Sequence, residues 1–243
     1  MNVYYALVPD KNYFLPASGN HLVMDYDRLR DVVCAGMDDM TYIDLYGALS
    51  LADYYNTDGH WRQERLWNVV AALGQGMGHE FAFDPAAYEA QSFDSFYGAY
   101  YGQSARLLTP DTLTWLENDI TRNAKVSLVD DKGYLQPSQM YNTADLTGID
   151  AYDIYLHGMQ PLIVLENPSA ETGRELILFR DSYGSSLAPV LLEHYAKITV
   201  VDLRYILPDV LPAYIQFGDQ EVLFLYSTIV ANQSDMVREF LVP

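Results

Sequence analysis

The sequence predicts one α/β domain built around a mainly parallel sheet. Short apolar segments alternate with segments of helical periodicity along the 243 residues, and this alternation is typical of βαβ units. The clearest case is a strand at 176–180, a polar turn at 181–186, a helix over 186–196 and a strand at 198–202. Half of the residues are hydrophobic and 14% are aromatic, which is enough apolar material for a large core.

Other elements follow from the same patterns. The remaining predicted strands are the apolar runs 3–8, 41–43, 124–129 and 221–226. The remaining predicted helices are 25–36, 61–74, 111–120 and 208–215, with plausible starts such as Asp25 and Thr109-Pro110-Asp111. Residues 81–106 and 130–150 lack clear periodicity and are predicted to be long loops over the sheet.

No internal repeat or linker-like tract indicates a domain boundary. We therefore expect residues 1–243 to form a single domain, either alone or as the C-terminal part of a longer secreted or membrane-anchored protein. The chain has neither a signal-peptide pattern nor an apolar run of membrane-spanning length.

Charge and composition exclude several functions. Fourteen Lys and Arg stand against 33 Asp and Glu, for a net charge of -19, which repels nucleic acid, anionic lipid and anionic polymers. The single cysteine, Cys34, excludes an intrachain disulfide and a Cys-based zinc cluster. The five histidines lack ligand spacing. We expect no metal and no cofactor.

Ser182 is the candidate nucleophile. It lies in the turn after the predicted strand 176–180, and open α/β sheets bind ligands at the carboxyl ends of their strands. Backbone N–H groups and the dipole at a helix start favour a developing negative charge, which suits an oxyanion hole. The alternative is that Asp181 or Ser182 only caps the helix.

His60 and Asp58 are the candidate base and its partner. His60 stands at a loop-to-helix junction, where a general base is held in place and remains accessible. Asp58 can turn back to accept a hydrogen bond from the imidazole and so fix its tautomer. The alternative makes Asp58 an N-cap and His60 a surface residue.

These residues carry a family resemblance. Thr57-Asp58-Gly59-His60-Trp61 resembles the Thr-Asp-x-His-Trp element of the bacterial family named for its Asp-His-His-Trp motif, and the equivalent element of alginate O-acetyltransferase-like proteins. Arg180-Asp181-Ser182-Tyr183-Gly184 resembles the serine turn of that group, and residues 96–104 a further element. The Asp-His pair precedes the serine, which is the reverse of ordinary SGNH hydrolases. One departure is Gly59, where the namesake motif has a second histidine.

The resemblance implies a flavodoxin-like, three-layer α/β/α fold of the SGNH-hydrolase type with permuted motif order. It also implies ester chemistry on carbohydrate hydroxyls. Ser182 would attack an acyl carbonyl while His60 takes its proton and Asp58 orients the ring, and water or a sugar hydroxyl would release the acyl group. The resemblance further implies a location outside the bacterial cell or at its surface. It also implies that a membrane protein supplies the acyl group.

Candidates for the oxyanion hole come from two places. The backbone N–H groups of Ser182 and Tyr183 are the first pair. Ser227 and Thr228 are the second, because they stand roughly where ordinary SGNH enzymes place an asparagine side chain.

Candidate substrate-binding residues have structural alternatives. Arg180 and Arg204 lie at strand ends and are expected either to bind a substrate carboxylate or phosphate, or to pair with one of the many carboxylates. Tyr100, Tyr101 and Gln103 are expected either to line a sugar cleft or to pack within their loop.

Two functions remain open from the sequence. One is an acetylesterase or O-acetyltransferase that acts on a glycan or a small acyl ester. The other is a catalytically silent glycan-binding or scaffold protein of the cell envelope, which the missing oxyanion asparagine and Gly59 suggest.

Overall fold

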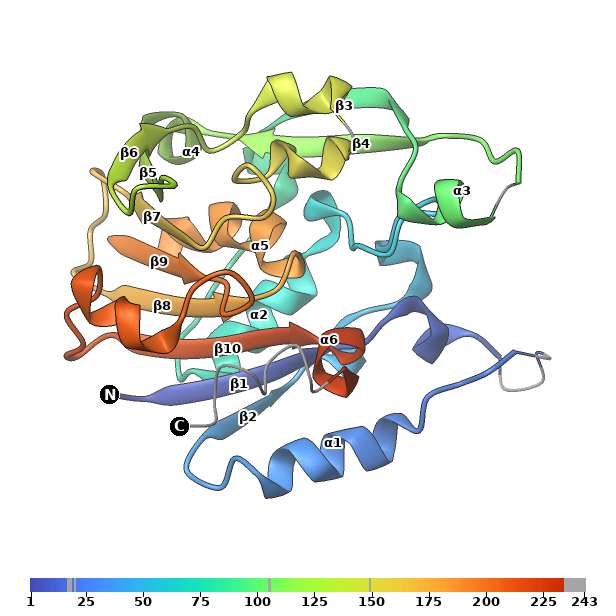
Figure 1. Cartoon of the computed structure of the whole chain (residues 1–243), viewed down its shortest axis with the longest axis horizontal. Coiled ribbons are helices and arrows are strands. Elements are labelled where there is room, and N and C mark those ends of the chain that lie inside the picture. The colour runs from blue at the N-terminus through green and yellow to red at the C-terminus, as the bar shows by residue number, and fades with distance from the viewer. Residues whose placement is uncertain (17–18, 20, 105, 149, 234–243) are drawn as a thin grey trace.

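An eight-stranded sheet forms the centre of the computed structural model, which describes residues 1–16, 19, 21–104, 106–148 and 150–233 (Figure 1). Five neighbouring strands, from β2 to β9, run parallel, and β7, β5 and β6 then pair antiparallel. The predicted, mainly parallel α/β sheet is confirmed. In spatial order the strands are β2 (Thr41–Asp44), β1 (Val3–Val8), β10 (Glu221–Ser227), β8 (Glu175–Arg180), β9 (Lys197–Val201), β7 (Leu162–Glu166), β5 (Lys125–Val129) and β6 (Leu135–Ser138).

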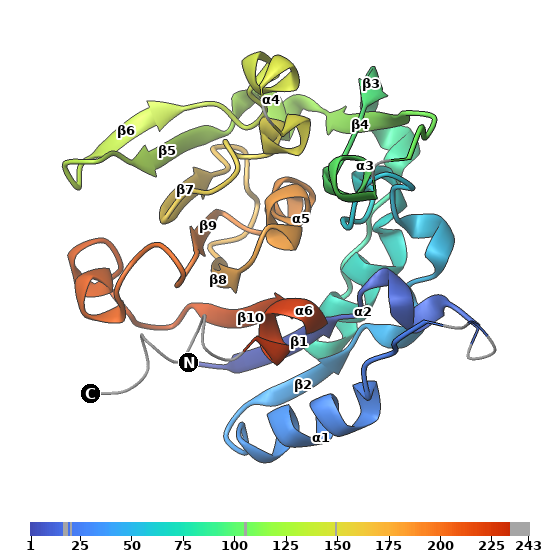
Figure 2. The same ribbon diagram turned by 45° about the vertical axis from the view of Figure 1, so that its right-hand side comes forward.

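Helices cover both faces of this sheet. Alternate residues of β8 point to opposite sides, so Leu176 and Leu178 enter one buried cluster while Ile177 and Phe179 enter another. The first face packs against α2 (Trp67–Gly76) and α5 (Tyr183–Leu191). The second is covered by the 3-10 turn Pro208–Ala213, and by α1 (Tyr26–Ala35) with α6 (Thr228–Asn232) (Figure 2). The result is the expected three-layer arrangement.

A separate hairpin lies beside the main sheet. It pairs β3 (Glu89–Phe96) with β4 (Asp111–Glu117), and α3 (Ala99–Ser104) stands between them in the chain. The prediction of a helix at 111–120 is therefore wrong. Asp111, Leu113 and Trp115 are buried, whereas Thr112 is exposed and Thr114 is half-buried, which is the two-residue period of a strand. The loop predicted over 81–106 likewise contains β3 and α3.

Three other predicted helices, at 25–36, 61–74 and 186–196, are present with shifted ends. The predicted helix 61–74 begins with the 3-10 turn Gln63–Arg65 before α2, and the predicted 186–196 begins earlier, at Tyr183. The helix predicted at 208–215 is instead the 3-10 turn Pro208–Ala213, since Pro212 inside it lacks the N–H group that an α-helix needs there. The strands β6 and β7 were not predicted, and β6 lies within the predicted loop 130–150.

Short elements complete the chain. The helix α4 spans Asp119–Asn123, and further 3-10 turns are Lys11–Phe14, Tyr46–Ala48, Leu51–Asp53, Pro85–Ala87, Thr143–Thr147, Ala151–Ile154 and Leu192–His194. Among the described residues, no helix combines the length and the apolar character needed to cross a membrane.

Candidate active site

Ser182 lies between the carboxyl end of β8 and the first residue of α5. Its side chain does not cap the helix. The buried Asp181 does so instead, because its Oδ1 accepts the Tyr183 N–H at 3.1 Å while its Oδ2 accepts the Ser227 N–H at 2.7 Å. Asp181 thus ties the ends of β8 and β10 together and leaves the serine hydroxyl available.

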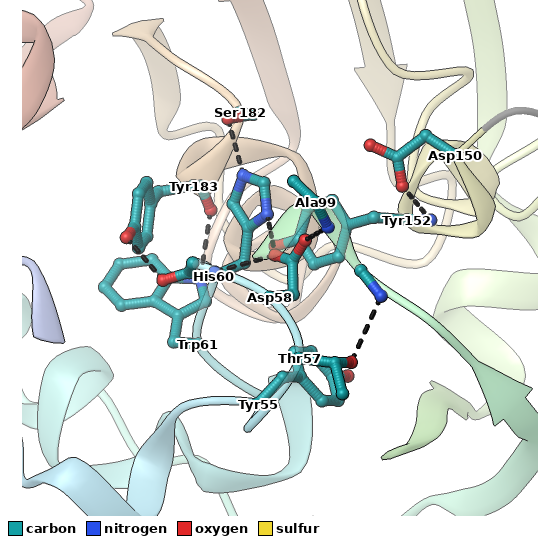
Figure 3. Close-up of polar contacts among 12 residues, drawn as sticks. Tyr55, Thr57, Asp58, His60, Trp61, Ala99, Asp150, Tyr152, Ser182 and Tyr183 are labelled. Carbon is teal, nitrogen blue, oxygen red and sulfur yellow. Dashed lines mark hydrogen bonds and ion pairs between the residues drawn. The ribbon is translucent and has the colours of Figure 1, made fainter. Parts of the chain in front are cut away.

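The structure brings Ser182, His60 and Asp58 into one hydrogen-bonded chain (Figure 3). Ser182 Oγ lies 2.6 Å from His60 Nε2, although the two residues are 122 positions apart. His60 Nδ1 lies 2.5 Å from Asp58 Oδ1. The Asp58 carboxylate also accepts the backbone N–H groups of His60 at 2.8 Å and Ala99 at 2.9 Å. This geometry allows His60 to take a proton from the serine hydroxyl.

Burial and charge set the protonation of this pair. Burial by itself raises the pKa of the Asp58 carboxyl, but the imidazole of His60 and the two backbone donors outweigh it and hold the pKa at about 2. Burial by itself lowers the pKa of His60, and the Asp58 carboxylate outweighs it, with Asp181 and Asp150 acting in the same direction, so the pKa is raised. Asp58 is therefore ionised at neutral pH and stabilises a protonated His60.

Asp111, the first residue of β4, anchors the loop that carries Asp58. Its buried carboxylate accepts the Thr57 N–H and the Thr57 hydroxyl, each at 2.7 Å, and the Asn56 N–H at 3.0 Å. Arg62 donates to the same carboxylate at 3.2 Å. In the sequence, Asp111 is evident only as a predicted helix start, and no local pattern connects it with Thr57, 54 positions earlier.

Lys11 holds the same loop from the other side. Its ammonium donates to the carbonyl oxygens of Tyr55 at 2.6 Å, Asn56 at 3.2 Å and Asp58 at 2.9 Å. It also lies 4.8 Å from the ring centroid of Tyr100. Sequence reasoning missed Lys11, since a lysine in a polar loop carries no signal that distinguishes it from a surface lysine.

Trp61 locks the loop onto α5. The fully buried indole donates to Ser186 Oγ at 2.9 Å and to the Tyr183 carbonyl at 3.2 Å. The Tyr183 hydroxyl returns a hydrogen bond to the Gly59 carbonyl at 2.7 Å (Figure 3). A Cβ at Gly59 would lie 3.2 Å from the Tyr100 hydroxyl, so a larger residue here requires Tyr100 to move slightly.

Ser182 and His60 line a cavity of about 340 Å³. Its walls also include Tyr152, Asp153 and Ser185. Burial raises the pKa of Asp153 to about 6, and the nearby carboxylates of Asp150 and Asp145 act in the same direction. The cavity is of the size that encloses a small organic ligand.

Arg180 and Arg204 also line the cavity, but both pair with the buried Asp202. Arg204 binds it through two bonds, Nε to Oδ1 at 2.9 Å and Nη2 to Oδ2 at 2.7 Å. Arg180 is itself buried, with Nη1 3.5 Å from Asp202 Oδ2 and Nη2 donating to the Gly158 carbonyl at 3.2 Å. Both arginines therefore pair with a carboxylate of the protein, which is the second of the two alternatives that the sequence left open for them.

Ser227 and Thr228 lie outside the set of residues that line the cavity, and their hydroxyl groups have other hydrogen-bond partners. Ser227 Oγ caps α6 by accepting the Val230 N–H at 3.3 Å, and Thr228 Oγ1 donates to Asp10 at 2.9 Å. The Tyr183 N–H, the other predicted donor, is the group already bound by Asp181.

Tyr101 and Gln103 lie on α3, outside the set of residues that line the cavity. The Tyr101 ring packs on Tyr97, with centroids 4.4 Å apart, and Gln103 is exposed. For Tyr101 the structure shows packing within its own segment, which is the second of the two expected alternatives.

In the described part of the chain, no group of three or more His, Cys, Asp or Glu side chains is arranged to hold a metal ion.

A family model described as DHHW protein matches residues 46–201, which is more than half of the chain. The matched part contains all three members of the hydrogen-bonded chain. None of the curated proteins compared with this sequence is a significant match.

Solved structures share the fold at low sequence identity. A DHHW family protein from Eubacterium siraeum is 23% identical with a TM-score of 0.80, over 100% of this chain and 84% of that one. PatB1 from Bacillus cereus is 19% identical with a TM-score of 0.74, over 95% and 83%. A second PatB1 structure, described as carrying a sulfonyl adduct, has a TM-score of 0.70 at 20% identity, over 93% and 81%. The O-acetyltransferase domain of Pseudomonas putida AlgJ is 13% identical with a TM-score of 0.50, over 93% and 74%.

Gly98 tests how closely α3 approaches the site. A Cβ at this position would lie 2.2 Å from Asp58 Cβ and 2.5 Å from Oδ2. We expect Gly98→Ala to lower the free energy of unfolding by about 2 kcal/mol, because the side chain forces Asp58 and its loop to move. The measurement is urea unfolding.

Gly102→Ala on α3 is the matched control, since its Cβ would meet nothing within 4 Å. It should leave stability unchanged or slightly raised. Equal unfolding midpoints for the two variants would contradict the close approach at Gly98.

Proposed function

Since this chain belongs to the DHHW family, we propose that it performs serine-dependent acyl transfer on a carbohydrate, with Ser182 as nucleophile, His60 as base and Asp58 as its orienting partner. The observation that carries this proposal is the continuous chain from Asp58 Oδ1 through both ring nitrogens of His60 to Ser182 Oγ. Ser182, at one end of this series of hydrogen bonds, lines a cavity, so its hydroxyl can meet a substrate.

The first half-reaction forms an acyl-enzyme. Ser182 Oγ attacks the acyl carbonyl while its proton moves to His60 Nε2, and the Asp58 carboxylate stabilises the imidazolium that results. The tetrahedral intermediate then expels the donor's alcohol oxygen, which takes the proton from His60. The acyl group is left as an ester on Ser182.

The second half-reaction releases the acyl group. A hydroxyl group gives its proton to His60 Nε2 as it attacks the carbonyl carbon of the Ser182 ester. The tetrahedral intermediate then breaks its bond to Ser182 Oγ, which takes the proton back from His60. Water makes the enzyme an esterase, and a sugar hydroxyl makes it an O-acetyltransferase. The similarity to a structure described as an O-acetyltransferase domain supports the second outcome.

Ser185 is our candidate for the second oxyanion donor, beside the Ser182 N–H. The Tyr183 N–H is bound to Asp181, and the next two N–H groups of α5 donate to the carbonyl oxygens of Asp181 and Ser182. Ser185 Oγ is buried, lines the same cavity and has no hydrogen-bond partner among the described residues. A buried hydroxyl without a partner is uncommon in folded proteins, and here a developing oxyanion would supply one.

The surroundings favour an uncharged glycan as acceptor. The chain carries a net charge of -19, and the cavity includes Asp150 and Asp153 beside two arginines that share the carboxylate of Asp202. An anionic acceptor would be repelled at long range. As part of the same proposal, we place the protein at the surface of a bacterium, with a membrane protein as acyl donor.

Ester hydrolysis tests the nucleophile and the base. We expect the chain to release p-nitrophenol from p-nitrophenyl acetate, with kcat/KM lowered by about 10³ or more in Ser182→Ala and in His60→Ala. Phenylmethylsulfonyl fluoride should label Ser182, as read by peptide mass spectrometry. The exposed Ser92→Ala is the control and should match the wild type.

Two results would count against the triad. One is hydrolysis at the wild-type rate by the Ser182→Ala variant. The other is the absence of both hydrolysis and labelling in the wild type, which would turn attention to glycan binding without catalysis.

The pH profile tests the Asp58 and His60 pair. A protonated His60 cannot accept the serine proton, so activity is lost as pH falls through its pKa. Burial lowers the pKa of His60, but the Asp58 carboxylate has the larger effect and raises that pKa above its ordinary value of 6.5. We expect the acid limb of kcat/KM to have its midpoint above 6.5. In Asp58→Asn the limb should move to lower pH, and an unmoved limb would contradict the coupling.

Ser185→Ala tests the oxyanion donor. The change removes one oxygen from a buried site, and we expect kcat to fall by about 10²-fold with KM little changed, as for loss of one oxyanion donor. Steady-state kinetics on the same ester measure this. A wild-type kcat would rule Ser185 out of the oxyanion hole.

A further inference from the structure

Tyr152 lies flat against the ring of His60. The two ring centroids are 3.9 Å apart and the planes differ by 9° (Figure 3). Tyr152 comes from the 3-10 turn Ala151–Ile154, a segment separate from both the loop that carries His60 and the turn that carries Ser182. Its side chain is buried. A third part of the chain therefore reaches the proposed base.

Two polar contacts fix the position of Tyr152. Its hydroxyl lies 2.8 Å from Ser186 Oγ, the same oxygen that accepts the Trp61 indole N–H at 2.9 Å. At the other end, the Asp150 carboxylate accepts the Tyr152 backbone N–H at 2.9 Å. Burial raises the pKa of the Tyr152 phenol well above its ordinary value, so the ring is neutral beside His60.

The two hydrogen bonds of the His60 ring do not prevent its rotation about the line that joins Nδ1 and Nε2. Only packing against the ring can limit this rotation. The bonds at Nδ1 and Nε2 hold two points of the imidazole. Rotation about the line through these points changes the plane of the ring and therefore the directions of the Nδ1–H bond and of the Nε2 lone pair. A flat aromatic surface at 3.9 Å limits that rotation. The Tyr183 ring on His60 is tilted by 55° at 5.0 Å and supplies no parallel surface.

We infer that Tyr152 is a positioning residue for His60: its ring face holds the imidazole in the plane that joins Asp58 to Ser182 and stabilises the imidazolium formed when His60 takes the serine proton. The face of a tyrosine ring attracts a cation, and this attraction is strongest in desolvated sites. The stack is thus stronger when His60 carries the proton than when it is neutral. The kinetic consequence rests on the proposed function, whereas the effect on His60 titration does not.

Other groups also act on His60, and a test has to hold them constant. The titratable and charged groups that face it are Asp58 on its own loop, Asp150, Tyr152 and Asp153 on the neighbouring turn, Asp181 and Tyr183 at the serine turn, and Arg180 and Arg204 in the cavity wall. A change confined to the Tyr152 side chain leaves the other groups in place. Comparing an aromatic with an aliphatic replacement then isolates the ring face.

The experiment is an NMR titration of the His60 imidazole, assigned with the His60→Gln variant, in the wild type and in Tyr152→Phe, Tyr152→Leu and Tyr152→Met. We expect Tyr152→Phe to keep the wild-type pKa of His60, because the ring face remains. Tyr152→Leu and Tyr152→Met should lower it, because the cation loses its aromatic partner. Two aliphatic variants are included so that one folded protein without the ring is available, as checked by thermal unfolding.

Kinetics supply a second readout. On p-nitrophenyl acetate, the aliphatic variants should lose about tenfold in kcat/KM and shift the acid limb to lower pH. An unchanged His60 pKa in a folded aliphatic variant would overturn the inference. If the wild type hydrolyses no ester at any pH, the proposed function fails, and the titration still decides whether Tyr152 stabilises the imidazolium.

Discussion

The hydrogen bond between His60 Nε2 and Ser182 Oγ is the constraint on which the site depends. It joins two segments that are 122 positions apart. A single hydrogen bond contributes about 1 kcal/mol net, whereas ordering one residue of backbone costs about 1 to 2 kcal/mol. The bond cannot order the loop 54–61 by itself. Other contacts must hold the loop before the two atoms can meet.

Buried polar contacts hold this loop from three directions. Asp111 binds the backbone and side chain of Thr57, Lys11 binds carbonyl oxygens on the other side, and Trp61 is tied to α5 through Ser186. The hairpin of β3 and β4 supplies the first of these contacts, and the start of α3 adds the Ala99 N–H to Asp58. Elements outside the main sheet therefore help to set the geometry of the site, while β8 and α5 position the serine and α5 also anchors the loop through Ser186.

Local patterns explain what could be predicted. The strands 3–8 and 221–226 were evident as apolar runs between polar segments, because a strand buried on both faces needs them. Helix α1 followed from Asp25 and the apolar spacing after it. The prediction of a helix at 111–120 was wrong because a short apolar segment can fit both the helical and the strand period. Pairing with β3 makes this segment a strand.

The α/β alternation, the acidic charge and the residues able to act as nucleophile, base and orienting carboxylate could be predicted, because they are properties of composition, spacing and side-chain chemistry. Which of these groups meet depends on how the folded chain packs. The fold uses the Ser227 hydroxyl to cap α6 and pairs the Thr228 hydroxyl with Asp10. It also packs Tyr152 on His60 and brings Asp111 and Lys11 to the Asp58 loop. Those partners lie far apart in the chain, and their meeting depends on the packing of the whole fold rather than on any local pattern.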